Sequence, residues 1–293
     1  MPYEDPLLDI IRFPLVDQYV APYVKFGTLQ THIHELIFFY LFYTGIFFAS
    51  HIISPLLVSA KKWDALKSKD KTYFHVHVVS MIQCLIILVL ITPMFNDPVL
   101  KQDRIFGYTP YGGLIASAAS GYFLWDAINA FYFIRKFGIG FAVHGVISFF
   151  VSFIAYNPFI LFYAPVFLLF EISTPFLNIR WFDLKLPGVF SEKFVLINNI
   201  ILIILFFVVR ICWGWYWIFQ LAWDFWLTHT DPRFPYLFAA VILTGNFVLD
   251  ILNVYWFSLM AKIAIKTIQN MMKGQKTGLQ IDEETIKGKK KED

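Results

Sequence analysis

Long apolar stretches separated by short polar segments dominate the chain. They lie at about 35–59, 74–95, 111–134, 141–156, 158–175, 194–222 and 235–261. Most contain the roughly 20 residues that an α-helix needs to cross about 30 Å of hydrocarbon. Backbone groups in lipid must be satisfied within the segment, and the runs lack the alternation of membrane β-strands. The pattern predicts an all-α, polytopic membrane helix bundle with about seven transmembrane helices.

The fourth and fifth runs are shorter than the others and meet at Asn157-Pro158. They fit either two full crossings or a tight hairpin that stops within the membrane, and in both cases their outer ends lie on one side. We expect one transmembrane domain at 35–265, preceded by a lumenal segment at 1–34. The Gly-, Lys- and acid-rich tail at 266–293 is expected to be disordered and cytosolic.

Composition strengthens the membrane assignment. Hydrophobic residues make up 58% of the chain and charged residues 15%, with a mean hydropathy of +0.61. Soluble domains have about 25% charged residues. A single soluble core of this size would not bury 34 Phe, 15 Tyr and 9 Trp. The chain is therefore expected to be integral to a membrane.

Charge indicates how the helices are oriented. Most of the 24 Lys and Arg residues lie at 61–73, 135–140, 176–193 and from Lys262 onward. Because basic loops stay cytosolic, the N-terminus is expected to be lumenal and the C-terminus cytosolic. Lys290 and Lys291 close to the C-terminus resemble a dilysine signal for the endoplasmic reticulum membrane, and a solubilising charge run is the alternative.

Polar side chains inside the predicted helices are the candidate functional residues, because such groups usually face the interior of a bundle. With a helical rise of about 1.5 Å per residue, five of these residues are expected within about 12 Å of the cytosolic face: His77, Asp126, His144, Glu171 and Asn253. Asp250 and Arg210 lie deeper, and we expect them to pair directly or through water. The sequence predicts a shared polar pocket below the cytosolic headgroups.

The stretch FEISTPFLNIRWF at 170–182 mixes polar and aromatic residues. Asn178 and Arg180 are expected at the cytosolic rim, where Trp181 anchors the helix at the interface. Thr174-Pro175 is expected to bend or end the helix, because proline lacks an amide donor and restricts the residue before it.

Two His-x-His pairs have the appearance of metal-ligand pairs, at His32 and His34 and at His75 and His77. Residues i and i+2 of a helix point to different sides, so neither pair is expected to share one ion. Cys84 and Cys212 lie in apolar runs and are expected to act as small hydrophobic residues. We therefore predict no metal site and no cofactor.

Several motifs occur in the order and spacing found in one membrane protein family. They are GYFLWD at 121–126, VHG at 143–145, the 170–182 stretch, FFVVRI at 206–211 and LNVYWF at 252–257. Over about 35–265 the chain resembles TLC-domain membrane proteins, in particular the small TLC-domain-containing branch. The resemblance implies a helix bundle around a lipid-accessible cavity, in an endoplasmic-reticulum-type protein concerned with lipid.

The same family includes ceramide synthases, which join a fatty acyl group from acyl-CoA to a sphingoid base. Those enzymes carry an adjacent His-His pair where this chain has His144-Gly145, so only the first histidine has a counterpart. The polar signature that follows the pair in those enzymes is replaced by the apolar VISFFVSFIAY.

Two main classes of function follow. In the first, the protein acts in lipid homeostasis by binding or handling a phospholipid or sphingolipid, with no nucleic-acid partner. Its expected cavity residues are Glu171, Asn178, Arg180, Arg210, Asp250 and Asn253. The second is an acyltransferase with acyl-CoA as substrate, and a sorting receptor for membrane proteins is a third possibility.

In the acyltransferase, His144 is the base, Asp126 orients it and His77 is a second histidine. In the non-catalytic protein, Asp126 and His144 instead form a structural hydrogen bond between two helices. The missing second histidine favours the first class.

Overall fold

The structure, a computed structural model, describes residues 4–272 of the 293-residue chain. Within this range every regular element is helical, as the apolar pattern predicted. The longer helices are α2 (Leu29–Leu57), α4 (Ser68–Ile91), α6 (Pro110–Tyr132), α8 (Ile139–Ile154), α10 (Thr174–Lys185), α11 (Glu192–Leu205), α12 (Gly214–Thr228) and α13 (Tyr236–Met272). The charged C-terminal segment with Lys290 and Lys291 lies outside the described residues.

Short helices connect or extend the longer ones. They are α1 (Pro14–Tyr19), η1 (Ala21–Tyr23), α3 (Ala60–Ala65), η2 (Pro93–Asn96), α5 (Pro98–Gln102), α7 (Ile134–Phe137), η3 (Leu161–Tyr163), α9 (Ala164–Leu168) and η4 (Leu169–Ser173). A further segment, η5 (Phe206–Trp213), is a π-helix that joins α11 to α12.

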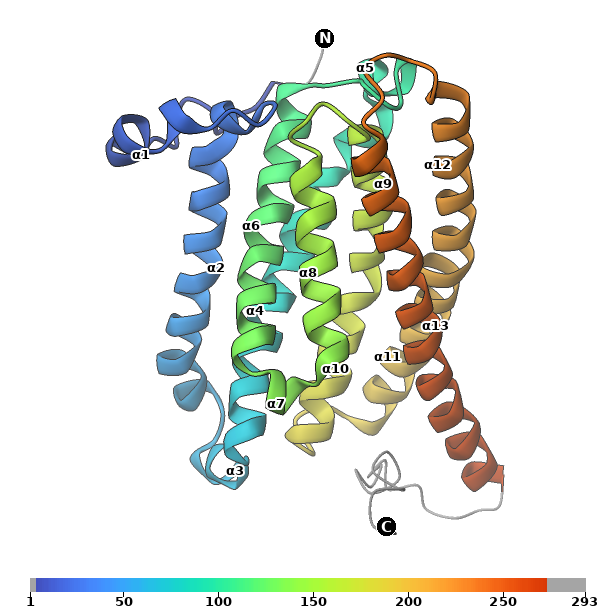
Figure 1. The fold of residues 1–293 in the computed structure, drawn as a ribbon. Helices are drawn as coiled ribbons and strands as arrows, with labels where there is room; N and C mark the ends of the chain where they lie inside the picture. The colour runs from blue at the N-terminus through green and yellow to red at the C-terminus, as the bar shows by residue number, and fades with distance from the viewer. Residues whose placement is uncertain (1–3, 273–293) are drawn as a thin grey trace.

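Five stretches of the described chain are long and apolar enough to cross a membrane: Leu29–Leu57, Ser68–Asn96, Leu161–Lys185, Glu192–Thr228 and Tyr236–Gln269. The multi-pass helix bundle is therefore confirmed, whereas the count of seven is not. α6 is rich in Gly, Ala and Ser, which lowers its hydropathy, and α8 has only 16 residues. Both helices nevertheless run side by side between α2 and α13 (Figure 1).

Two spans extend further than the apolar runs that revealed them. Pro175 does not end the span Leu161–Lys185, because it lies in the first turn of α10, where a missing amide donor costs little. The 3-10 segment η4 precedes it, and the span continues to Lys185. α13 likewise continues to Met272, so residues 266–272 are helical rather than part of a disordered tail.

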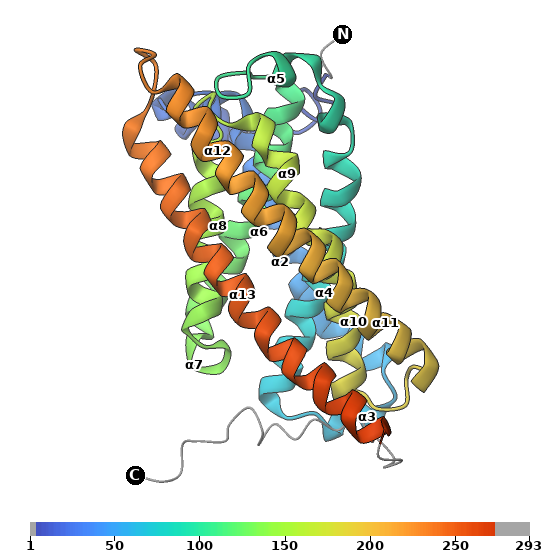
Figure 2. The ribbon, with the colours of Figure 1, turned by 90° about the vertical axis from the view of Figure 1, so that its right-hand side faces the viewer.

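The two ends of the bundle differ. α2 and α13 both begin at one end, which we call the amino end, and α5 also lies there (Figure 1). The opposite end, which we call the carboxyl end, contains α3, α7 and the end of α13. Figure 2 shows that α13 crosses the bundle obliquely beside α8 and α12.

α2 and α6 pack closely because α6 presents small residues along one face. Gly113, Ser117 and Gly121 are spaced four residues apart and are all buried. A methyl group on Gly121 would lie 2.6 Å from Cβ of Phe39 and 2.9 Å from the backbone nitrogen of Tyr40. Small residues at this spacing let the backbones of membrane helices approach each other.

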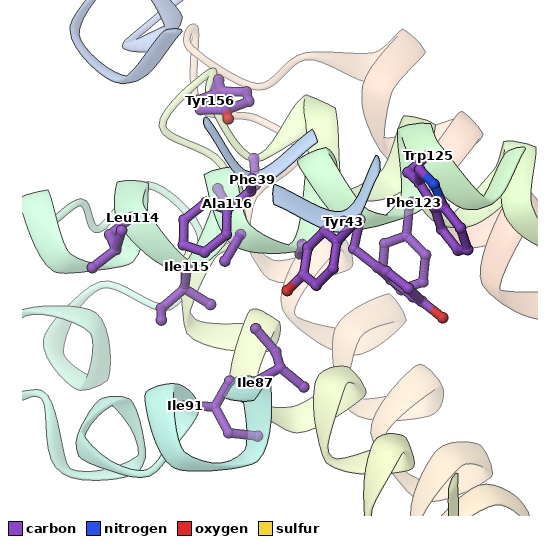
Figure 3. Packing of buried hydrophobic residues seen from close by; sticks show 14 of the residues in the cluster. Phe39, Tyr43, Ile87, Ile91, Leu114, Ile115, Ala116, Phe123, Trp125 and Tyr156 are labelled. Atoms are coloured by element: carbon purple, nitrogen blue, oxygen red, sulfur yellow. The ribbon is translucent and has the colours of Figure 1, made fainter. Parts of the chain in front are cut away.

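Large aromatic side chains fill the rest of this interface. Figure 3 shows Tyr43 of α2 near Phe123 of α6 and Phe39 of α2 beside Ala116 of α6, within the main buried cluster. Tyr43 is fully buried, and its hydroxyl donates a hydrogen bond to Gln83 of α4. This cluster fixes the side of the bundle that supports the cavity described next.

Candidate functional site

A cavity lies between the helices of the bundle. Its walls come from α6, α8, the stretch from η3 to η4, η5 and α13. Most of the lining side chains are apolar, such as Ile115 and Phe123 of α6 and Phe167 of α9. Ala116 and Ala119 make room for it, because their side chains on α6 are small. The cavity is thus suited to an apolar ligand.

Polar groups interrupt the apolar lining. Four of them come from four different elements: His144 of α8, Glu171 of η4, Arg210 of η5 and Asn253 of α13. All four were expected from the sequence as polar groups inside spans. The structure brings their side chains to one cavity although they lie far apart in the chain.

Two of these groups, Glu171 and Asn253, lie deeper than the sequence suggested. Glu171, Arg210 and Asn253 are near the middle of the spans Leu161–Lys185, Glu192–Thr228 and Tyr236–Gln269. The helices continue beyond the ends of the apolar runs, so the prediction that Glu171 and Asn253 lie within about 12 Å of the cytosolic face is wrong. From this middle layer the cavity extends toward the amino end, where Ile160 and Tyr163 line it.

Arg210 is buried, with only 8% of its surface exposed. Its guanidinium donates from Nε to Oγ of Ser173 at 3.0 Å, from Nη2 to Oγ1 of Thr174 at 3.1 Å and from Nη1 to Oδ1 of Asn253 at 3.4 Å. It also lies 5.1 Å from the ring centroid of Phe206. All three acceptors are neutral, so these contacts orient the cation without neutralising its charge.

Glu171 is the carboxylate in the cavity lining that can compensate this charge. It is half-buried, and its carboxylate attracts Arg210 through space. Within the described residues the two side chains form no ion pair at contact distance. The cavity therefore contains a fixed cation and a separate carboxylate, and each has room for a ligand group.

The backbone at Arg210 is itself unusual. Arg210 lies within η5, where hydrogen bonds follow the wider i→i+5 pattern. Such segments inside α-helices occur frequently at functional sites. Here the π-helix occupies the part of the long span that contacts Ser173 and Thr174.

His144 lines the cavity without its expected partner. Its ring packs edge-on against Phe123 and Trp256, with centroid distances of 6.4 and 5.8 Å. Asp126 lies on the neighbouring face of α6, where its Oδ2 is 2.9 Å from the position that a methyl group on Gly145 would occupy. In the part of the chain that the structure describes, His144 and Asp126 share no direct hydrogen bond, so the pair expected from the sequence is wrong.

His77 and Asn178 form a side-chain hydrogen bond with each other and lie outside the cavity lining. His77 Nδ1 is 2.6 Å from Oδ1 of Asn178, and the His77 ring stacks on Trp181 at 4.4 Å. Asn178 is completely buried, because α10 continues through this position. Asn178 was expected to line the cavity, and the structure instead places it against His77, outside the lining.

The remaining candidates also lie outside the lining. Arg180 is half-buried on α10, with Asp183 as its charged neighbour. Asp250 is buried on α13, and its Oδ1 is 3.3 Å from the position of a methyl group on Gly214. The donors of Arg210 go to other acceptors, so no direct pair with Asp250 forms among the described residues.

The sequence analysis missed a charged network at the amino end of the cavity. Tyr163, which lines the cavity, donates from its hydroxyl to Oδ2 of Asp224 at 2.6 Å. Arg104 Nε lies 3.1 Å from the same carboxylate oxygen, and its Nη2 donates to Tyr163 at 2.9 Å. The available signal was Asp224, a charged residue near the end of α12. It lies two residues beyond the apolar run at 194–222 and therefore outside the predicted helix.

Comparison with known proteins identifies the fold family. The sequence profile described as TLC domain matches residues 73–262, which include every polar cavity residue named above. The chain belongs to the TLC domain family. It is 34% identical to a TLC domain-containing protein of Saccharomyces cerevisiae, over 90% of this chain and 96% of that protein.

Two other relatives support the same assignment. A TLC domain-containing protein of Schizosaccharomyces pombe is 33% identical over 93% of this chain and 92% of its own length. Human TLC domain-containing protein 4 is 27% identical over 79% of this chain and 86% of its own length. The TLC domain match begins within α4, so α1 and α2 lie outside it.

Proposed function

We propose that this TLC domain protein acts in lipid homeostasis by binding one membrane lipid inside its cavity. The acyl chain lies along the apolar wall toward the amino end, and the polar headgroup lies at Arg210. The observation that carries this proposal is a buried arginine whose hydrogen-bond acceptors are all neutral, at the polar side of a mostly apolar cavity.

The lining of the cavity supports a lipid rather than a small polar metabolite. Ligand pockets are mostly apolar with a few polar groups that fix the orientation of the ligand. The cavity has this composition, with apolar side chains over most of its walls and polar groups gathered near Arg210. The ligand would come directly from the surrounding bilayer.

The charges favour a headgroup that contains a phosphate. Arginine binds phosphate strongly through several N–H donors, and burial strengthens this attraction. Glu171 is placed to attract a positively charged amine of the same headgroup. Phospholipids and sphingolipids both provide these two charges, and they are the partners that we propose.

We also propose that the protein resides in the endoplasmic reticulum membrane with its amino end in the lumen. The basic segment at 61–73 includes α3, and the one at 135–140 overlaps α7, and both helices lie at the carboxyl end (Figure 1). Basic loops stay on the cytosolic side during insertion.

Lipid analysis of the purified protein tests the proposed function. We expect one class of phosphate-containing lipid to co-purify with the full-length protein in mild detergent, and Arg210→Gln to lose it. Arg233→Gln is the matched control, because Arg233 is exposed in the connection before α13. Arg210→Lys keeps the charge and should retain part of the lipid if the charge is what matters.

Two outcomes would overturn the proposal. One is the same bound lipid in Arg210→Gln and Arg233→Gln, when both variants elute as folded protein. The other is release of CoA from added acyl-CoA that disappears in His144→Ala, which would replace lipid binding by acyl transfer.

A further inference from the structure

A second buried polar cluster lies at the amino end, away from the cavity. Asp5 precedes α1, and His32 and Glu35 are in the first turns of α2. Their side chains are 1%, 0% and 1% exposed. His32 Nδ1 is 2.7 Å from Oε2 of Glu35 and 3.5 Å from Oδ2 of Asp5. One ligand atom from each residue lies within 4.8 Å of the others.

Two carboxylate oxygens of this cluster have no hydrogen-bond donor among the described residues. They are Oδ2 of Asp5 and Oε1 of Glu35. The other Asp5 oxygen, Oδ1, accepts the backbone N–H of Leu7 at 2.9 Å. Buried acceptors without donors are costly, and a cation bound between the two carboxylates would remove this cost.

The histidine is held in the orientation that a metal ligand requires. Its Nδ1 faces the two carboxylates, and its Nε2 lies 2.7 Å from the hydroxyl of Tyr108. Metal-ligating histidines almost always donate their second ring N–H to a neighbouring oxygen, which fixes the tautomer. Gly113 of α6 leaves space for this ring, because a methyl group there would lie 2.1 Å from Nε2.

We propose that Asp5, His32 and Glu35 bind a divalent transition-metal ion. One imidazole nitrogen and two carboxylates suit Zn²⁺ and Mn²⁺. Three protein ligands leave at least one coordination position for water. The ion would tie the segment before α1 to the start of α2.

This site is not recognisable from the sequence, because Asp5 is far from His32 in the chain and the His32-x-His34 pair does not act together. His34 does not join His32. Its Nδ1 accepts the backbone N–H of Phe13 at 3.1 Å, and its Nε2 lies 3.0 Å from Oδ1 of Asp17. His32 and His34 are residues i and i+2 of a helix and point to different sides. Asp5 comes from another segment, so this restriction does not separate it from His32.

Metal analysis of the full-length protein tests the site. The protein is purified without a polyhistidine tag, incubated with Zn²⁺ or Mn²⁺, and dialysed before elemental analysis. We expect equimolar metal in the unchanged protein, loss of it in the double variant Asp5→Asn with Glu35→Gln, and no change in the control His34→Gln. Tyr108→Phe should weaken binding by about tenfold, as for other groups that orient a ligand.

A second measurement needs no variant at the ligands. Chelation should lower the melting temperature of the unchanged protein, and added Zn²⁺ should restore it. Absence of equimolar metal after incubation would overturn the proposal and would mean that protons occupy the cluster. Metal retained by the double variant would overturn it as well. Neither result depends on whether the cavity binds lipid.

Discussion

The hydroxyl of Tyr163 donates a 2.6 Å hydrogen bond to Asp224, which joins the start of the span Leu161–Lys185 to the end of α12. Arg104 completes the network with an ion pair of 3.1 Å to Asp224. The side chain of Asp224 is only 13% exposed. This network closes the amino end of the cavity through Tyr163.

Asp224→Asn should therefore destabilise the protein. The substitution removes the charge that pairs with Arg104 and weakens the bond to Tyr163, at a cost of about 2 kcal/mol for a hydrogen bond to a charged group. The measurement is the thermal or denaturant midpoint in detergent. Asp231→Asn is the control, because the Asp231–Arg233 pair lies at the surface and such pairs contribute little. Equal midpoints for the two variants would show that the buried network is not stabilising.

Gly121→Ala should weaken the packing of α2 against α6. The added methyl group would lie 2.6 Å from Cβ of Phe39, so the helices must separate or shift. Overpacking of this kind costs about 1–3 kcal/mol. Gly45→Ala is the matched control, since a methyl group there meets no atom within 4 Å. We expect a lower melting temperature for Gly121→Ala only, and a similar decrease in both variants would contradict the close approach at Gly121.

His77→Ala should reduce stability without changing lipid content. The substitution removes the donor to Oδ1 of Asn178, a side chain that is completely buried. An unsatisfied buried acceptor costs about 1–3 kcal/mol. Lipid analysis and melting of the same sample separate this role from that of His144, whose ring lines the cavity. Loss of bound lipid in a folded His77→Ala protein would assign His77 to the site after all.

The sequence predicted the parts of the fold that depend on local composition. The apolar runs predicted the membrane helix bundle. The polar residues inside those runs were predicted to face its interior, and four of them, His144, Glu171, Arg210 and Asn253, line the cavity. These predictions succeed because lipid imposes a strong and local requirement on each segment.

The errors concern relations between distant segments. The depth of Glu171 depends on where α10 ends, and Pro175 gave a misleading stop signal because proline is tolerated in a first helical turn. The pairing of Asp126 with His144 depends on how α6 and α8 rotate against each other. The contact between Asp5 and His32 depends on the path of the chain before α2. None of these is fixed by periodicity within one helix.

Glu171→Gln should change which lipids the protein binds. With Glu171 and Arg210 both charged, the cavity contains one charge of each sign and favours a headgroup with both an amine and a phosphate. Removing the carboxylate leaves the Arg210 charge uncompensated, so anionic lipids should be enriched over zwitterionic ones by about tenfold, the equivalent of about 1.4 kcal/mol. Arg210→Gln should lose lipids of both kinds, because it removes the phosphate contact.

The measurement is the ratio of anionic to zwitterionic phospholipids that co-purify from membranes of one composition. Asp183→Asn is the control, because it also removes a carboxylate from the same span but lies outside the cavity lining. If Glu171→Gln and Asp183→Asn carry the same lipids as the unchanged protein, Glu171 does not contact the headgroup. Since Glu171 and Arg210 come from separate spans, a shift confined to Glu171→Gln would also establish that one ligand contacts both spans.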